Sequence, residues 1–248
     1  MIVYRNTKGG FINDVRDNLI AYRIEESFRA KGIAHNNDAE FRSWANSLQY
    51  MRNAIDDDAI SNDCELAIEY QIPLTSKRVD FILAGKDAAG RNNVVVVELK
   101  QWETSGKTSR PDIVTAFVGG SQRAVTHPSY QAYSYAKIIE YFNEEVSNYD
   151  ISLHPCAFLH NYKESERSNI DCPLYESAVS LAPVFLARDT AKLRDYIKSF
   201  IVEKDGVDLL MKLENGKLKP AKALQDCLSS MLEGNVEFQR KPPVRHVL

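Results

Sequence analysis

Apolar residues near the N-terminus recur at the spacing of an amphipathic helix. Phe11, Val15 and Leu19 are four residues apart, which predicts a helix over about 10–31. The segment "HNNDAEF" supplies polar residues of the kind that start helices, and apolar residues again follow at helical spacing. The pattern therefore predicts a second helix over about 38–55.

After residue 60 the period changes from that of a helix to that of a strand. "CELAIEYQI" (64–72) alternates apolar and polar residues, which predicts a half-buried strand. "RVDFILA" (78–84) and "VVVVELK" (94–100) predict two further strands, joined by the Gly- and Asn-rich connection "GKDAAGRNN". Residues 101–127 are polar and contain "GGSQR", so we expect a long loop there.

The next segments add a helix and a fourth strand. "HPSYQAYSYAKIIEYF" predicts a helix with His127 at its entry and Pro128 in its first turn. "LHPCAFLH" (153–160) predicts a strand. The order is helix, three antiparallel strands, helix and strand, with helices added at both ends. This order predicts a three-layer α/β core.

Four parts are expected along the 248 residues. Helices over 1–56 pack on a core over 57–182, a helical extension occupies 183–235, and the tail "QRKPPVRHVL" makes 236–248 linker-like. The four cysteines are scattered without a CxxC pair, which argues against a zinc or iron–sulfur site.

Charge and hydropathy limit the partners. The net charge of −3 means that contact with nucleic acid needs a local basic patch. The N-terminus lacks the apolar core of a signal peptide, and no apolar stretch approaches 18 residues. We therefore expect a cytoplasmic protein with no membrane partner.

The two predicted strands around "GKDAAGRNN" bring acidic residues together. A hairpin centred near residue 89 places Asp80 opposite Glu98, and the preceding turn places Glu69 opposite or diagonal to Asp80. Opposed side chains have Cβ atoms about 4.5–5.5 Å apart, so these carboxylates repel one another. A divalent cation such as Mg²⁺, which binds carboxylate oxygens, would compensate. Lys100 points to the same side and can position a water beside a phosphate.

The same register sorts the apolar residues. Ile68 and Tyr70 are expected to share one face of the sheet with Val79 and Phe81. A slip of one residue would move these apolar side chains to the wrong face.

A simpler interpretation remains open for part of this pattern. Charged residues such as Glu98 and Lys100 commonly end a strand because it reaches solvent. Asp80 inside "VDFIL" is harder to explain in that way, since an unpaired buried carboxylate is costly.

Asp80 followed by Glu98-Leu99-Lys100, on this order of elements, resembles the PD-(D/E)xK nuclease superfamily. Val79 stands where many members have proline. The resemblance implies a restriction-endonuclease-like fold and hydrolysis of phosphodiester bonds that depends on Mg²⁺ or Mn²⁺. It implies that Asp80 and Glu98 bind the metal, with Glu69 close enough to join them, and that Lys100 positions the attacking water.

A second motif lies on the helix after the third strand. Gln131 and Tyr135 resemble the QxxxY motif of the RecB-like branch, which implies that both hold the substrate strand. Tyrosines on such a helix also fit plain core packing. Arg78 and Gln101 are expected beside the site, where they would bind substrate. The first helices add Glu40, Ser43 and Trp44 as candidates, for which a solvated Glu and a core Trp are the alternative.

Wider similarity covers most of 38–200. Segments including "IPLTSKRVDFIL" and "VELKQWE" resemble the N-terminal region of bacterial proteins that continue into a Schlafen-like P-loop ATPase/helicase domain. The chain itself contains no GxxxxGK[ST] sequence. The resemblance implies an ATPase or helicase partner, in cis or in trans, and nucleic-acid processing or phage defence.

Two other functions remain open at this stage. The same fold can bind nucleic acid without cleaving it, or the acidic row can be structural in a protein-interaction domain. Lys107, Arg110 and Arg123 in the expected loop fit either a basic surface that follows a nucleic-acid backbone or an ordinary polar loop. DNA is favoured over RNA as the polymer.

Overall fold

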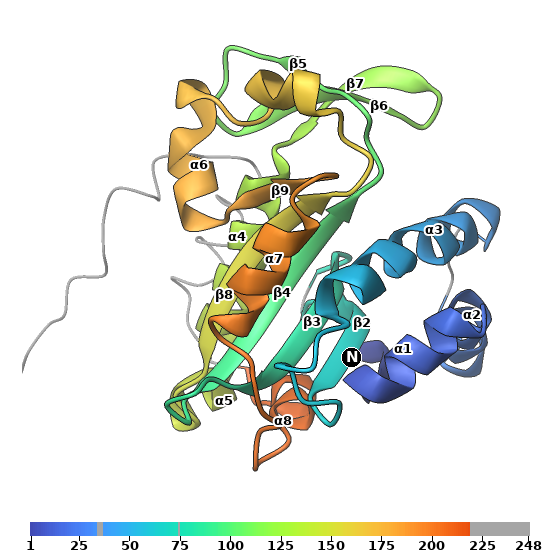
Figure 1. Cartoon of the computed structure of the whole chain (residues 1–248), viewed down its shortest axis with the longest axis vertical. Coiled ribbons are helices and arrows are strands. Elements are labelled where there is room, and N and C mark those ends of the chain that lie inside the picture. Colours follow the sequence, from blue (N-terminus) through green and yellow to red (C-terminus); the bar gives the residue numbers. More distant parts are fainter. Residues whose placement is uncertain (34–36, 74, 219–248) are drawn as a thin grey trace, which may run out of the picture.

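The computed structural model describes residues 1–33, 37–73 and 75–218, and a mixed six-stranded sheet lies at its centre (Figure 1). In spatial order the strands are β1 (Ile2–Thr7), β2 (Glu65–Gln71), β3 (Arg78–Lys86), β4 (Asn92–Lys100), β8 (Ser152–Leu159) and β9 (Val184–Leu186). Neighbours from β1 to β4 are antiparallel, whereas β8 runs parallel to β4 and β9 parallel to β8. The chain is thus an α/β protein, as its pattern predicts.

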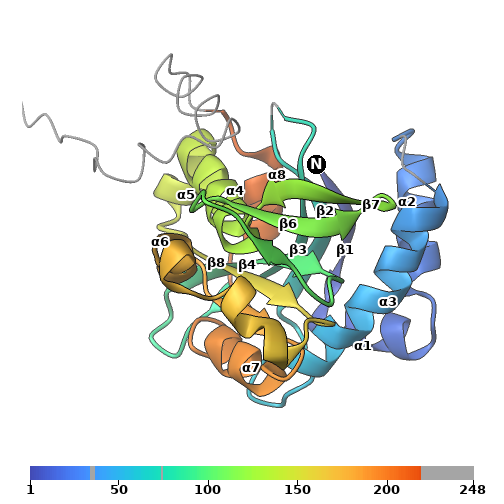
Figure 2. The ribbon, with the colours of Figure 1, turned by 90° about the horizontal axis from the view of Figure 1, so that it is seen from above.

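Helices cover both faces of this sheet (Figures 1 and 2). One face packs against α1 (Lys8–Arg16), α2 (Ile20–Ala30), α3 (Asn37–Ile55) and α7 (Thr190–Lys198), and we call this apolar cluster the α3-side core. The other face packs against α4 (Pro128–Phe142), α5 (Glu144–Asn148) and α8 (Leu209–Asn215), and forms the α4-side core. Helix α6 (Glu176–Leu181) and two 3₁₀ turns (Glu164–Asn169 and Pro173–Tyr175) complete the helical elements of the described residues.

The valine run before Glu98 is explained by these two cores. Val95 and Val97 are buried in the α3-side core, and Val94 and Val96 in the α4-side core. A strand covered on both faces has no polar alternation, so its sequence is continuously apolar. Burial of all four side chains fixes β4 along the middle of the molecule.

Several predicted elements are confirmed, and two are not. The helix over 38–55 is α3 and the strand over 153–160 is β8. The helical extension from 183 contains α7 and α8, preceded by the short strand β9. The single helix over 10–31 is wrong, because the chain forms α1 and α2 with a break at Asn18, whose φ is +58°. Asn tolerates this left-handed conformation better than most residues.

The edge strand β1 was not anticipated, because a six-residue segment has too little periodicity. It pairs with β2 in antiparallel register, with Tyr4 opposite Ile68. The predicted tail 236–248 lies outside the described residues, as do 219–235 of the predicted extension. Among the described residues, no helix combines the length and the apolar character needed to cross a bilayer.

The expected loop over 101–127 is instead a small antiparallel sheet. Its strands are β5 (Gly106–Lys107), β6 (Ile113–Val118) and β7 (Ser121–Thr126). Gly119 and Gly120 have φ angles of +60° and +81° and form the two-residue turn of the β6–β7 hairpin. A Gly-Gly pair between β-branched segments is a hairpin signal that the polar character of this region obscured.

The predicted strand register is confirmed, but the predicted faces are partly wrong. Ile68 pairs with Phe81 and Tyr70 with Val79, as the spacing requires. Ile68 and Phe81 pack in the α3-side core, whereas Tyr70 and Val79 pack in the α4-side core. The faces exchange because Glu69, between the two pairs, adopts a φ of +56°. Strand β2 is also buried on both faces rather than half-buried.

Helix α4 starts with a histidine cap. The His127 Nδ1 atom accepts a hydrogen bond from the Ser129 amide at 3.2 Å, and Nε2 lies 2.8 Å from the Ile170 carbonyl oxygen, to which it donates. Pro128 follows in the first turn, as predicted. His127 is fully buried, and this burial lowers its pKa to about 4. The cap therefore requires a neutral imidazole.

We predict that acid destabilises the protein through His127. Since its pKa is about 6.5 unfolded and about 4 folded, its contribution is complete above pH 6.5 and is lost as the pH falls towards 4. The loss amounts to about 3 kcal/mol. Urea unfolding between pH 7 and 4 measures it. His127→Asn keeps an acceptor at the cap. The free energy of unfolding of this variant should be lower than that of the parent at pH 7, and it should change less between pH 7 and 4. An equal pH dependence in the two proteins would contradict the prediction.

Candidate functional site

The predicted site residues gather where β4 ends and the β2–β3 pairing changes face. A cavity of about 110 Å³ lies there between α3 and the sheet, and Trp44, Glu69, Asp80 and Lys100 are among its lining residues. A wider cavity of about 320 Å³ shares Trp44, Glu69 and Asp80 and adds Arg78. Four predicted residues from three strands, Glu69, Arg78, Asp80 and Lys100, therefore line two cavities that share part of their walls.

Glu98 is the most deeply buried acid of this region, with 2% of its surface exposed. Its Oε1 atom accepts hydrogen bonds from Lys100 Nζ at 2.6 Å and from Gln131 Nε2 at 2.7 Å. Its Oε2 atom is buried and has no hydrogen-bond partner in the described part of the chain. A buried carboxylate oxygen without a partner is costly, and Glu98 itself is not among the residues that line the two cavities.

Asp80 lies beside Glu98 at the end of the β3–β4 ladder. Backbone pairing of these strands ends at Phe81 and Val97, and Asp80 Oδ2 then accepts a hydrogen bond from the Leu99 amide at 2.8 Å. Burial, and next the charge of Glu98, raise the pKa of Asp80 well above its usual range. The charge of Glu98 therefore acts on Asp80 as predicted, although the two residues do not form the expected ladder pair.

Lys100 supplies the positive charge next to these acids. Burial alone would lower the pKa of its ammonium group, but Glu98 and Asp80 together raise it. Lys100 therefore stays protonated and acts as a cation rather than as a base. Its Nζ also lies 5.6 Å from the centroid of the Trp102 ring.

Glu69 is directed to α3 rather than to Glu98. Its Oε1 atom accepts a hydrogen bond from Trp44 Nε1 at 2.8 Å, and Oε2 lies 2.6 Å from Arg78 Nε. Burial and then Asp80 raise the pKa of Glu69. Within the described ranges, no three His, Cys, Asp or Glu side chains form a group that could hold a metal ion. The expected three-carboxylate ligand set is therefore not assembled, and Asp80 and Glu98 form the remaining pair.

Arg78 and Gln101 join α3 to the sheet. Arg78 lies 3.0 Å from Glu40 and its guanidinium sits 5.0 Å from the centroid of the Phe28 ring, in addition to its contact with Glu69. Gln101 Nε2 donates to Ser43 Oγ at 2.9 Å and to Ser47 Oγ at 3.0 Å. Both predicted substrate-binding residues thus have protein partners in this structure.

The predicted Gln131–Tyr135 pair lies on α4 and reaches the acidic cluster through Gln131. The Gln131 amide nitrogen donates one hydrogen to Glu98 and the other to the Tyr135 hydroxyl oxygen at 3.0 Å. Tyr135 is buried in the α4-side core, and this burial raises the pKa of its phenol. The geometry makes Tyr135 a positioning residue for Gln131.

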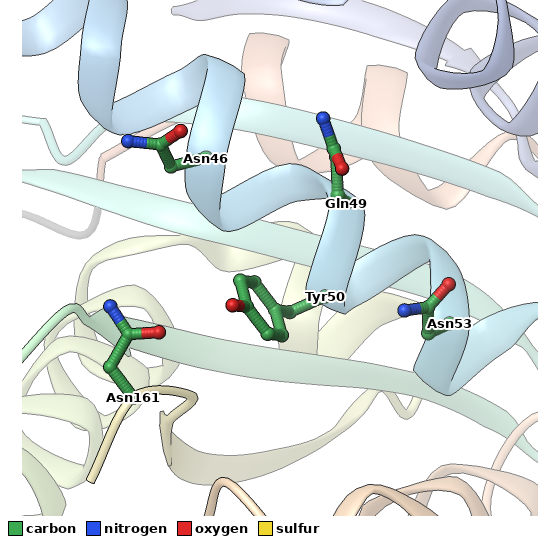
Figure 3. Close-up of a pocket in the computed structure, with 5 residues that line it drawn as sticks. All are labelled: Asn46, Gln49, Tyr50, Asn53 and Asn161. Carbon is green, nitrogen blue, oxygen red and sulfur yellow. The ribbon is translucent and has the colours of Figure 1, made fainter.

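A polar groove along α3 escaped the sequence reasoning. Its volume is about 380 Å³, and Figure 3 shows Asn46, Gln49, Tyr50 and Asn53 projecting from α3, with Asn161 across from them. The Asn161 amide donates to the Gln101 carbonyl oxygen at 3.4 Å, so the groove adjoins the end of β4. The three residues Asn46, Gln49 and Asn53, at intervals of three and four, were the available signal.

Comparisons with known proteins find no matching family model, no matching curated protein and no matching solved structure. The functional argument therefore rests on the residues of the site. They supply two neighbouring acids, one with an unpartnered oxygen, and a lysine held as a cation beside them.

Replacing Asp80 by asparagine should stabilise the protein in the absence of divalent cations. The new amide side chain would keep an acceptor for the Leu99 amide while removing the repulsion with Glu98, for a gain of about 1 kcal/mol. Urea unfolding in EDTA at pH 8 measures the change.

Asp87→Asn is the matched control. Asp87 is buried but accepts hydrogen bonds from the Ala89 and Arg91 amides and pairs with the Arg91 guanidinium, which lowers its pKa. Loss of this charge should destabilise the protein. A loss of stability in both variants would contradict a repulsive contact between Asp80 and Glu98.

Proposed function

We propose that this protein is a metal-dependent nuclease of the PD-(D/E)xK type that hydrolyses phosphodiester bonds of nucleic acid, with DNA favoured over RNA. The single observation that carries the proposal is the state of Glu98. This acid is buried beside Asp80, is held by Lys100 and Gln131 through one oxygen, and keeps the other oxygen unpartnered among the described residues. The mixed sheet flanked by helices is compatible with a restriction-endonuclease-like core.

Asp80 and Glu98 fit a hard divalent cation. Mg²⁺ in proteins is commonly bound by one or two carboxylates together with water and phosphate oxygens. Asp80 and Glu98 would hold such an ion, which would give the unpartnered Glu98 oxygen a partner and offset the repulsion between the two acids. A Mg²⁺ or Mn²⁺ ion bound there supplies Lewis-acid activation of water and of the phosphate.

The chain's own residues prepare this chemistry. Lys100 keeps a positive charge where negative charge develops on a phosphate, and its contact with Glu98 fixes the ammonium group. Gln131 fixes the orientation of the Glu98 carboxylate, and Tyr135 fixes Gln131. Glu69 anchors α3 at the opening of the site through Trp44 and Arg78.

A non-cleaving nucleic-acid-binding module is the second candidate. The observation that favours it is that Glu98 Oε1 already accepts two hydrogen bonds, so part of the acid is satisfied without a metal. In either case an ATPase or helicase in cis or in trans is the partner we propose, in a cytoplasmic nucleic-acid processing or defence system.

Divalent cations should stabilise the parent protein. We expect Mg²⁺ or Mn²⁺ to raise the melting temperature in a concentration-dependent way, because an ion that binds only the folded state shifts unfolding by mass action. Glu98→Gln and Asp80→Asn should remove the shift, whereas Glu69→Gln should retain it, since Glu69 is held by Trp44 and Arg78. Scanning calorimetry against KCl of matched ionic strength measures this. A shift that survives in Glu98→Gln would place the ion elsewhere.

The parent should cleave labelled nucleic acid in Mg²⁺ or Mn²⁺ and not in EDTA. Glu98→Gln and Lys100→Met should each lower the rate about 100-fold or more, since each removes charge at the reacting phosphate. Electrophoresis of single- and double-stranded DNA and RNA substrates measures the products.

The exposed ion pair Glu103–Lys163 provides matched controls. Its atoms lie 3.0 Å apart on the surface, close in sequence to the site at Glu103. Glu103→Gln and Lys163→Met should cleave at the parental rate. Binding of nucleic acid without cleavage products under every metal condition would favour the non-cleaving module. Equal cleavage rates of Glu98→Gln and the parent would refute the proposed mechanism.

A further inference from the structure

The β6–β7 hairpin has a firmly packed base. Val114 is buried in an apolar cluster with Leu159 of β8 and Tyr175. The Tyr175 hydroxyl donates to the Ile113 carbonyl oxygen at 3.1 Å, and the His127 amide donates to the Asp112 carbonyl oxygen at 2.8 Å. These contacts hold both strands where they leave the body of the protein.

The outer half of the hairpin, residues 117–124, is not covered by such contacts, and we call it the arm. Residues 117–124 are all exposed, and Phe117 is 69% exposed, more than any other large hydrophobic side chain among the described residues. Val118 beside it is 36% exposed. Side chains alternate across a strand, so Phe117 and Val118 project from opposite faces of the arm. The arm therefore presents an aromatic ring to the surroundings.

The arm projects at the end of the sheet where the acidic cluster lies. In Figure 1 the hairpin extends beyond the end at which β4 terminates in Lys100. Figure 2, seen from above, shows the same hairpin crossing in front of β2 and β3 towards α2. In both views the hairpin lies at the end of the sheet where β4 ends, and Glu98 is two residues from that end of β4.

The charge of this region suits an anionic polymer. Residues 104–126 contain Lys107, Arg110 and Arg123 against one acid, Asp112, in a chain whose net charge is −3. Arg110 is paired with Asp112, whereas the Arg123 guanidinium bonds only to Ser121 Oγ among the partners found in the described residues. Arg123 lies opposite Ala116 and on the face away from Phe117. An exposed ring and an exposed cation on the two faces of one arm fit the base and the phosphate of a single strand.

We propose that the β6–β7 hairpin is a nucleic-acid-binding arm that stacks Phe117 on an unpaired base. The substrate class is therefore single-stranded nucleic acid, or a duplex that contains a single-stranded segment. This inference rests on the proposed function, because the partner is taken to be the polymer that the acidic cluster cleaves. Base stacking on an aromatic side chain is tolerant of sequence, since every base has a π face.

The test compares Phe117→Ala with the parent in EDTA, so that binding is measured without cleavage. Fluorescence anisotropy with a labelled single strand of about 20 nucleotides should show affinity reduced about 5- to 100-fold by Phe117→Ala. Phe117→Trp should restore the affinity, and affinity for a blunt duplex should change little. A 2-aminopurine base in the strand should be quenched by the parent and not by Phe117→Ala. Because Phe117 is exposed, its removal should leave the melting temperature unchanged.

Met211→Ala is the matched control. Met211 is 48% exposed on α8, which lies at the opposite end of the molecule in Figure 1, so its truncation should not affect binding. Unchanged single-strand affinity in Phe117→Ala would refute the binding role of the arm without contradicting the proposed nuclease activity. If the parent binds single strands without ever cleaving them, and Phe117→Ala weakens that binding, the result supports the arm and refutes the nuclease.

Two further outcomes also overturn the arm. A parent that binds no nucleic acid refutes it together with the proposed function. A parent that is a dimer by sedimentation, becomes a monomer in Phe117→Ala and keeps its single-strand affinity shows instead that the ring is buried against a second copy.

Discussion

The burial of Glu98 beside Asp80 is the interaction on which the rest of the site depends. Two like charges at the end of a sheet destabilise the fold unless something offsets them. Lys100 and Gln131 do so through one oxygen of Glu98, and the Leu99 amide does so for Asp80. The other Glu98 oxygen is left without compensation within the described residues. The valines of β4, buried in both cores, hold the acid in this unfavourable place.

A regular β2–β3 ladder would not produce this arrangement. The positive φ of Glu69 exchanges the faces of the sheet between the Ile68–Phe81 and Tyr70–Val79 pairs. Glu69 consequently turns to Trp44 on α3, while Asp80 turns to the backbone of β4. A non-glycine residue in this region is costly and persists where surrounding contacts enforce it. Here Trp44 and Arg78, which bind its carboxylate, provide the enforcement.

Much of this structure could be predicted from local sequence patterns. The hairpin spacing predicts the pairing of β3 with β4, and the preceding turn predicts the pairing of β2 with β3. The hydrogen bond from Gln131 to Glu98 was not predicted, because the resemblance implied only that Gln131 holds substrate. The face exchange at Glu69 could not be predicted, because it depends on a tryptophan 25 residues earlier in the sequence. The small sheet was missed because the polar residues of 101–127 hid β-branched segments on either side of Gly119 and Gly120. The short edge strand β1 depends on pairing with β2 rather than on its own periodicity.

Helix α3 contacts the residues at the edge of the acidic cluster on one side and forms the polar groove on the other. It holds Glu69 through Trp44 and Gln101 through Ser43, and its outer side forms the groove of Figure 3. Ser47 also lies 3.0 Å from His160, whose ring stacks on Tyr50 of that groove. Sites for small molecules are usually enclosed and mostly apolar. The cavities here are instead lined largely by polar side chains and are continued by neutral amides, with a projecting arm beside them. The polymer proposed as the substrate would pass the acidic cluster along such an extended polar surface, whereas a small substrate would need to be enclosed.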